Sequence, residues 1–122
     1  MMVRFTKMVL AAALVCTLCL PAVAAQPSGL ELTGNAWLKS SQNEKLAFLY
    51  GVSNVVAIEQ LLSQKEGTKP SLFVSSWMKA FGNDKWIAIE SKLNDWYAAH
   101  PDQASRGVFD VLWYEFMVPA TK

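Results

Sequence analysis

The pattern of apolar residues along the chain predicts a series of helices separated by short breaks. The strongest element is a helix over about residues 42–66. Ser41 and Glu44 match the S-x-x-E capping box at its start, and Gly67 can take the left-handed conformation that ends a helix. The apolar residues of this helix point in nearly every direction at 100° per residue: Leu46, Phe48, Leu49, Tyr50, Val52, Val55, Val56, Ile58, Leu61 and Leu62. Such a helix is typically central, and Gly51 within it would let a neighbour approach closely.

A second helix is predicted because Phe73, Trp77 and Phe81 recur every four residues before Gly82. Pro70 is acceptable in its first turn. The segment 72–74 taken alone fits a short strand equally well.

A third helix is expected to begin at Asn83 as its N-cap, with Asp84 at its positive end, and to end before Pro101. Its apolar residues share one face, and Ile87 lies outside that face. The face comprises Trp86, Ile89, Leu93, Trp96 and Tyr97.

A last helix is expected from about Ser105 to Val118, closed by Pro119. Before the first long helix, residues 33–38 could form one helical turn that docks Trp37, after a poorly ordered leader over 26–32. Four main helices with short connections predict an all-α fold, a compact bundle of about four helices.

The N-terminus has the order of a secretory signal peptide. Arg4 and Lys7 are followed by thirteen almost wholly apolar residues and then by small residues up to Ala25. Cleavage is expected after Ala24 or Ala25, and an uncleaved membrane anchor is the alternative. The expected domains are therefore a signal peptide, 1–25, and a single helical domain, 26–122, placed in the periplasm with no stable membrane anchor after cleavage.

Composition narrows the classes of partner. Two of the eleven basic residues lie in the predicted signal peptide, which leaves nine against ten acidic residues in the mature part. Nucleic acid is not expected as a partner, because there is no basic run to displace counterions from phosphates. Both cysteines, Cys16 and Cys19, also lie in the signal segment, so hydrophobic packing rather than disulfides is expected to hold the mature domain together.

The mature chain shows no set of residues typical of catalysis, metal binding or a cofactor site. Its one histidine, His100, precedes Pro101 at a predicted helix end, where an imidazole can cap the last turn. The tryptophans are expected mainly in the core, Trp37 being the least certain. Most of the scattered acidic residues are expected to lie on solvated faces: Glu59, Glu66, Glu90, Asp95, Asp110 and Glu115. The sequence therefore favours a binding protein over an enzyme.

The order of several short motifs resembles the Tai-type immunity proteins, which neutralise amidase toxins delivered by type VI secretion. The matching segments cover most of the chain from about Leu32 to Val118. They are Gly34-Asn35-Ala36-Trp37, Lys45-Leu46-Ala47-Phe48-Leu49-Tyr50-Gly51-Val52 and Trp96-Tyr97-Ala98-Ala99-His100-Pro101. The resemblance implies a small helical periplasmic protein, often a homodimer, that inhibits a peptidoglycan amidase by occluding its cleft. Members often carry cysteines in the mature domain, which this chain lacks.

The residues expected to contact a protein partner are exposed positions near helix ends: Thr68, Lys69, Pro70, Ile87, His100, Asp102 and Arg106. Two other functions stay open. One is a periplasmic stress or chaperone-like factor that shields unfolded proteins. The other is a carrier of a small apolar ligand held between helices, with Ser53, Asn54, Glu59 and Gln60 as polar contacts.

Overall fold

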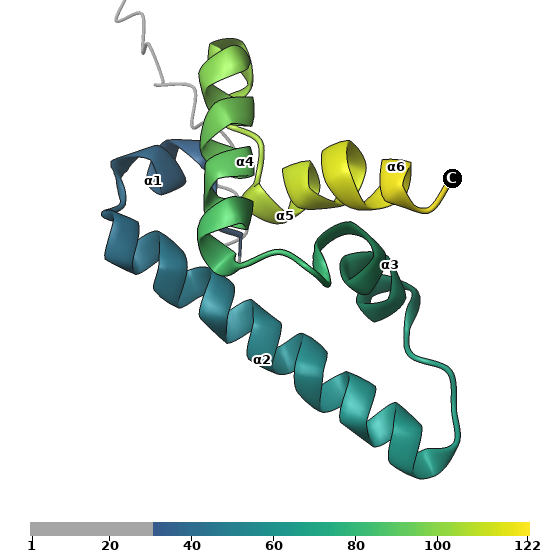
Figure 1. The fold of residues 1–122 in the computed structure, drawn as a ribbon. Coiled ribbons are helices and arrows are strands. Elements are labelled where there is room, and N and C mark those ends of the chain that lie inside the picture. The colour runs from purple at the N-terminus through teal and green to yellow at the C-terminus, as the bar shows by residue number, and fades with distance from the viewer. Residues whose placement is uncertain (1–30) are drawn as a thin grey trace, which may run out of the picture.

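The computed structural model describes residues 31–122, and this part of the chain is all-α (Figure 1). The predicted signal peptide and most of the predicted leader lie outside the described residues. In chain order, the elements are α1 (Gly34–Lys39), α2 (Gln42–Glu66), α3 (Leu72–Phe81), α4 (Trp86–Ala99), a 3-10 turn (Pro101–Gln103), α5 (Val108–Val111), a π-helical segment (Leu112–Met117) and α6 (Val118–Ala120). The predicted compact helical fold is confirmed.

The predicted ends of α2 are confirmed in atomic detail. The Ser41 backbone amide donates to Glu44 Oε2 at 2.7 Å, and the Glu44 amide donates back to Ser41 Oγ at 3.2 Å. Gly67 ends the helix with a φ of 66°, the left-handed conformation that costs a glycine little. The capping box and the glycine therefore set the length of α2.

Helix α3 is a helix throughout, so the alternative of a strand over 72–74 is wrong. Its N-cap is Ser71, whose hydroxyl accepts from the Val74 amide, and Pro70 precedes the helix instead of occupying its first turn. The carboxylate of Glu59 on α2 accepts a 3.0 Å hydrogen bond from the Ser71 amide. That bond fixes the start of α3 against α2.

The predicted start of α4 is also corrected. Lys85 is the N-cap residue, and Asn83 and Asp84 belong to the turn that follows α3. The Asp84 amide donates to the Phe81 carbonyl, and its carboxylate pairs with Lys92 across two turns of α4. Asp84 is therefore used in joining α3 to α4 and does not lie in the first turn of α4.

The last helix begins at Val108 rather than Ser105, because residues 104–106 are bonded to α1. The amides of Gly34 and Asn35 donate to the carbonyls of Arg106 and Ala104. The chain then widens into the π-helical segment and continues through Pro119, which was expected to end the helix. A wider turn leaves room for the proline ring, which in an α-helix collides with the carbonyl four residues earlier.

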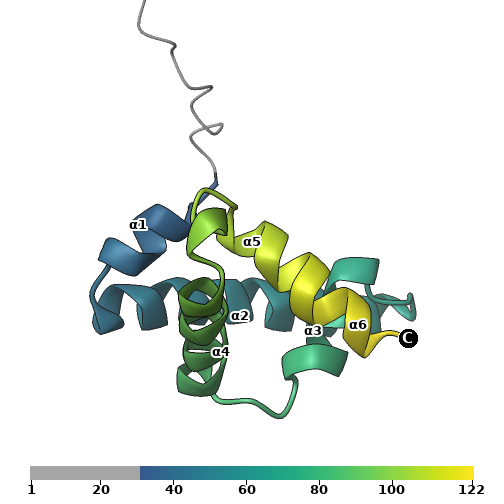
Figure 2. The same ribbon diagram turned by 90° about the horizontal axis from the view of Figure 1, so that it is seen from above.

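The core lies where α4 crosses α2 and where the C-terminal helical run covers α3 (Figures 1 and 2). Leu32, which was assigned to a poorly ordered leader, packs against this core, and its carbonyl accepts from the Val108 amide. The buried apolar residues come from every helix except α6: Trp37, Leu49, Val56, Val74, Trp77, Phe81, Ile89, Leu93, Tyr97, Val108, Val111, Leu112 and Met117.

Helix α2 is not central, contrary to the expectation from its apolar pattern. Of its 25 residues only Leu49, Val56 and Ser63 are buried, and they recur every seven positions along one side. A Cβ atom at Gly51 would have nothing within 4 Å, so no other part of the described chain approaches that glycine. The opposite side of α2 is left exposed although it is rich in apolar residues.

By length and composition, α2 is also the one helix among the described residues that could cross a membrane. The mean hydropathy of its most apolar 18 residues is 1.4, and 17% of that window is buried. Length and composition are weak arguments here, since α2 also carries a buried side that packs on α4.

Three helices meet in a polar network that the sequence did not reveal. Asn94 Oδ1 on α4 accepts from Trp37 Nε1 on α1 at 2.9 Å and from Lys45 Nζ on α2 at 3.0 Å. Asn94 Nδ2 donates to Glu90, and Gln42 on α2 donates to the same carboxylate. Glu90 is thus buried and hydrogen-bonded, which corrects its assignment to a solvated face.

Replacing Gly34 by Ala is expected to destabilise the protein by about 2 kcal/mol, because overpacked sites cannot relax freely. A Cβ atom at Gly34 would lie 2.2 Å from the buried Tyr97 ring and 2.7 Å from the Ala104 carbonyl oxygen. Urea unfolding of the variant measures the effect. The control is Asn35→Ala at the exposed next position of α1, which should change the free energy of unfolding little; equal effects of the two substitutions would contradict the prediction.

Candidate functional site

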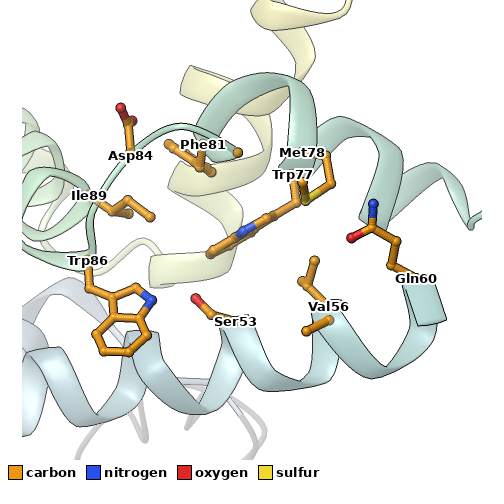
Figure 3. A pocket seen from close by; sticks show the side chains of 11 residues that line it. Ser53, Val56, Gln60, Trp77, Met78, Phe81, Asp84, Trp86 and Ile89 are labelled. Carbon is orange, nitrogen blue, oxygen red and sulfur yellow. The ribbon is translucent and has the colours of Figure 1, made fainter.

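The candidate site is an open cleft of about 270 Å³ between α2, α3 and the start of α4 (Figure 3). Helix α2 forms one wall, α3 the opposite wall, and the 82–86 turn closes one end. The lining residues are Ser53, Val56, Ala57 and Gln60 from α2, Trp77, Met78 and Phe81 from α3, and Gly82, Asp84, Trp86 and Ile89 from the turn and α4.

The cleft combines a rigid apolar floor with an accessible apolar rim. Trp77 and Phe81 are each 3% exposed and meet edge to face with their ring centroids 5.0 Å apart. On the rim, Trp86 is 41% exposed, and its ring is held by an edge contact with Tyr50 at 4.6 Å. Met78 forms the other side of the rim and is also exposed. An incoming apolar group would meet fixed rings below and aromatic and thioether surfaces at the sides.

A few polar groups border the cleft. Ser53 and Gln60 are half-buried and point toward it from α2 (Figure 3), and residues 31–122 offer their side chains no hydrogen-bond partner. Asp84 lies at the far end, where its carboxylate is paired with Lys92. The hydroxyl of Ser53 and the amide of Gln60 are therefore available to bond a molecule that enters.

The expected partner-contacting residues fall into three separate places. Thr68, Lys69 and Pro70 are exposed in the loop that joins α2 to α3, at the end of α2 that lies away from α4 (Figure 1). Ile87 is exposed on the first turn of α4, outside the buried stripe as predicted. None of these residues lines the cleft.

The third place is the turn after α4, which contains His100, Asp102 and Arg106. His100 is the C-cap of α4, its Nδ1 lies 2.7 Å from the Trp96 carbonyl oxygen, and its ring stacks on Trp96 at 4.3 Å. The expected capping role of His100 matches this geometry. Asp102 is exposed in the 3-10 turn.

Arg106 is occupied by contacts within the chain. Its guanidinium pairs with Asp110 and Glu115, bonds the side chain of Gln103, and lies over the Trp96 ring at 5.1 Å. The hydrogen bonds to Glu115 and Asp110 raise the pKa of Arg106. These contacts join the end of α4 to α5 and the π-helical segment, so Arg106 stabilises the fold in this structure.

Sequence reasoning identified part of the cleft without identifying the cleft itself. Ser53 and Gln60 were singled out as polar residues that could bind a ligand, and both line it. The other two residues of that set do not: Asn54 is exposed and bonds the Tyr50 carbonyl, and Glu59 bonds the Ser71 amide. Trp86 was expected on the buried face of α4, but its side chain is 41% exposed. Trp37, whose place in the core was the least certain, is fully buried.

Within residues 31–122, no group of three or more His, Asp or Glu side chains is placed to hold a metal ion. The residues that line the cleft offer apolar packing surface and, at Ser53 and Gln60, hydrogen-bonding groups.

The dependence of stability on pH tests how Tyr97 packs against the turn that contains Arg106. Burial raises the pKa of Tyr97 from 10.0 to about 12, with the Arg106 charge opposing and Asp110 assisting. Because the folded state favours the protonated phenol, the resulting stability is present below about pH 10 and is lost as the pH rises toward 12. We expect Tyr97→Phe to be less stable than the wild type at neutral pH, because it loses the 2.9 Å hydrogen bond to the Arg106 carbonyl. Between about pH 10 and 12, however, the free energy of unfolding of Tyr97→Phe should fall less than that of the wild type, because the variant has no phenol to ionise at this position.

Urea unfolding at a series of alkaline pH values measures this difference. Tyr114→Phe is the control, because that side chain is exposed. An alkaline stability profile of Tyr97→Phe identical in slope to the wild type would refute the assignment.

No protein-family model matches the chain, and neither a curated protein nor a solved structure matches it.

Proposed function

We propose that this chain is a binding protein that recognises a protein partner through the cleft between α2, α3 and α4. The observation that carries the proposal is the exposed ring of Trp86 beside a rigid apolar floor of Trp77 and Phe81. Tryptophan is among the residues that most often dominate protein–protein affinity. The fixed floor keeps the ordering cost of binding low.

The size of the cleft favours a protein side chain over a free small molecule. Sites that enclose a drug-sized ligand span ~300–1,000 Å³ and bury most of its surface. This cleft, at about 270 Å³ and open to solvent, falls below that range. It would accept one or two apolar side chains of a partner, with Ser53 and Gln60 bonding the partner's backbone at the rim.

The partner that the sequence suggests is a peptidoglycan amidase. The resemblance to Tai-type immunity proteins supports this choice of partner, and the export signal predicted over residues 1–25 is what a periplasmic inhibitor of such an enzyme would need. Inhibition would work by occlusion: the cleft would take up side chains at the mouth of the amidase active site, and the bound helical domain would block access of substrate. Such inhibition requires no catalytic group on this chain.

A carrier of a small apolar ligand is the second candidate, because Ser53 and Gln60 do face the cleft. Native mass spectrometry of the protein purified from its own host distinguishes this candidate. A bound molecule retained in the gas phase would favour the carrier, and its absence would favour the protein partner.

Trp86→Ala is expected to weaken amidase binding by at least about tenfold, the loss typical of an interface hot spot. The ring is partly exposed and is not among the buried core residues, so the fold should survive its removal. Isothermal titration of the protein with any peptidoglycan amidase that its neighbouring genes encode measures the affinity. Leu72→Ala is the control, because Leu72 is 69% exposed and lies outside the cleft. Failure of the wild-type protein to bind any such amidase would remove the immunity proposal.

A further inference from the structure

Helix α2 has a second apolar side, which faces away from the other helices. In Figure 1 it runs along one edge of the described domain, and the remaining helices all lie to one side of it. Ile58 lies two residues after the buried Val56, which is about 200° around the helix. The exposed side centred on Ile58 is here called the outer face, and it comprises Ala47, Tyr50, Gly51, Asn54, Val55, Ile58, Leu61, Leu62 and Lys65.

The outer face is apolar over most of its length. Its five large apolar side chains are each between 44% and 64% exposed: Tyr50, Val55, Ile58, Leu61 and Leu62. Exposed apolar patches of roughly 300–600 Å² on a small protein commonly mark an interaction site. Between Lys45 and Lys65 the only charged residue is Glu59, and its carboxylate is bonded to the Ser71 amide. About 28 Å of helix can therefore leave water without desolvating an unpaired charge.

The outer face offers little for a protein partner to recognise. Its one amide side chain is Asn54, whose Nδ2 donates to the Tyr50 carbonyl at 2.8 Å. Protein interfaces carry about one hydrogen bond per 100–200 Å², and this face has hardly a group free to make one. Gly51 leaves no recess in the chain's own packing, since nothing lies within 4 Å of its Cβ position. A long helix side without hydrogen-bonding groups suits lipid better than protein.

Lysines border the outer face. Lys65 ends it, Lys69 follows in the loop to α3, and Lys85 is the N-cap of α4. All three are exposed, and no ion pair within residues 31–122 engages them. Lys85 precedes Trp86, whose ring meets Tyr50 at 4.6 Å. Lysine, tryptophan and tyrosine are the side chains that favour the boundary between membrane and water.

Most of the neighbouring acidic side chains are already bonded. Glu44 accepts from the Ser41 amide, and Asp84 pairs with Lys92. Glu66, which is exposed beside Lys65, is the one carboxylate near the face that these contacts leave out. The unpaired charge around the outer face is therefore mainly positive, which favours a surface of anionic lipid.

We propose that the outer face lies on the surface of an anionic lipid bilayer, with α2 parallel to the membrane plane. Val55, Ile58 and Leu62 enter the boundary between headgroups and acyl chains, and Lys65 reaches the lipid phosphates. Helix α2 does not cross the bilayer, because its other side contributes Leu49 to the core. The contact is reversible, as expected where a single helix side supplies it.

This membrane contact goes beyond the proposed amidase binding and does not depend on it. Ser53, which lines the cleft, lies five residues before Ile58 and about 140° around the helix. Gln60 lies two residues after Ile58, about 160° away in the other sense. Neither residue therefore lies in the part of α2 that lipid would cover.

The test is cosedimentation of the protein, recovered after expression of the full chain, with lipid vesicles. Vesicles of phosphatidylethanolamine and phosphatidylglycerol supply the anionic surface, and vesicles of phosphatidylethanolamine and phosphatidylcholine the neutral one. The wild type should bind the anionic vesicles at least about threefold more tightly, and high salt should reduce the difference. A protein that stays in the supernatant with anionic vesicles overturns the proposal, and so does equal binding to both kinds.

A matched pair of variants locates the contact. Leu62 and Leu38 are both 47% exposed, and replacing either by Glu adds one negative charge. Leu62→Glu should weaken binding at least about tenfold, because a carboxylate resists transfer out of water, whereas Leu38→Glu on α1 should weaken it at most about twofold. Equal losses overturn the proposal. Binding that neither variant alters would belong to the apolar segment over residues 8–20 and would overturn it too.

A variant that should gain binding guards against reading a loss of fold as a loss of contact. Asn54→Leu removes the only amide from the outer face and should strengthen binding at least about threefold. Its free energy of unfolding should not fall, since leucine favours a helix and the position is exposed. Unchanged binding of Asn54→Leu contradicts the proposal.

A protein partner on the same face is the competing outcome. Sedimentation equilibrium without lipid detects it: a wild-type assembly that Leu62→Glu dissolves, in a protein that ignores vesicles, overturns the membrane proposal. Titration of Leu62→Glu with an amidase separates the two proposals, because this variant leaves the cleft intact. Failure of the amidase proposal would show instead in Trp86→Ala.

Discussion

The side chain of Asn94 is the interaction on which the arrangement of the N-terminal half depends. Its amide oxygen accepts from the indole of Trp37 and from Lys45, and its amide nitrogen bonds the buried carboxylate of Glu90. The indole nitrogen of a fully buried tryptophan needs an acceptor, and burial of Glu90 needs donors. One asparagine therefore holds α1, α2 and α4 in a fixed relation. That relation leaves one side of α2 exposed to solvent and lets another side line the cleft.

Much of the fold could be predicted from local chemistry. Ser41, Glu44 and Gly67 define α2 because a capping box and a left-handed glycine act within a few residues. The beginnings of α4 and α5 could not be placed in this way, because tertiary bonds decide them: Asp84 pairs with Lys92, and Ala104 and Arg106 bond the start of α1. The position of α2 was predicted wrongly for a different reason. The prediction assumed that apolar residues on every side of a helix are covered by the rest of the chain. Three such residues of α2 are instead exposed: Val55, Ile58 and Leu62.

The candidate site was predicted only in part. Ser53 and Gln60 could be singled out because polar residues on an apolar helix need partners, but periodicity says nothing of which residues from α3 and α4 will face them. The partial exposure of Trp86 follows from the turn over 82–85, which sets the first turn of α4 at the edge of the core. Arg106, one of the charged residues expected to contact a partner, is instead engaged by Asp110, Glu115 and Trp96. These contacts depend on how the chain turns after α4.

The π-helical segment keeps two core residues on the same side of the C-terminal helical run. Leu112 and Met117 are both fully buried and five residues apart, a spacing that a wide turn brings to one side and an α-helix does not. With one residue fewer between them, the two side chains would be four positions apart, a spacing that an ordinary α-helix also brings to one side. The wide turn therefore lets the chain carry one more residue between these two core positions than an α-helix would, with both side chains still buried.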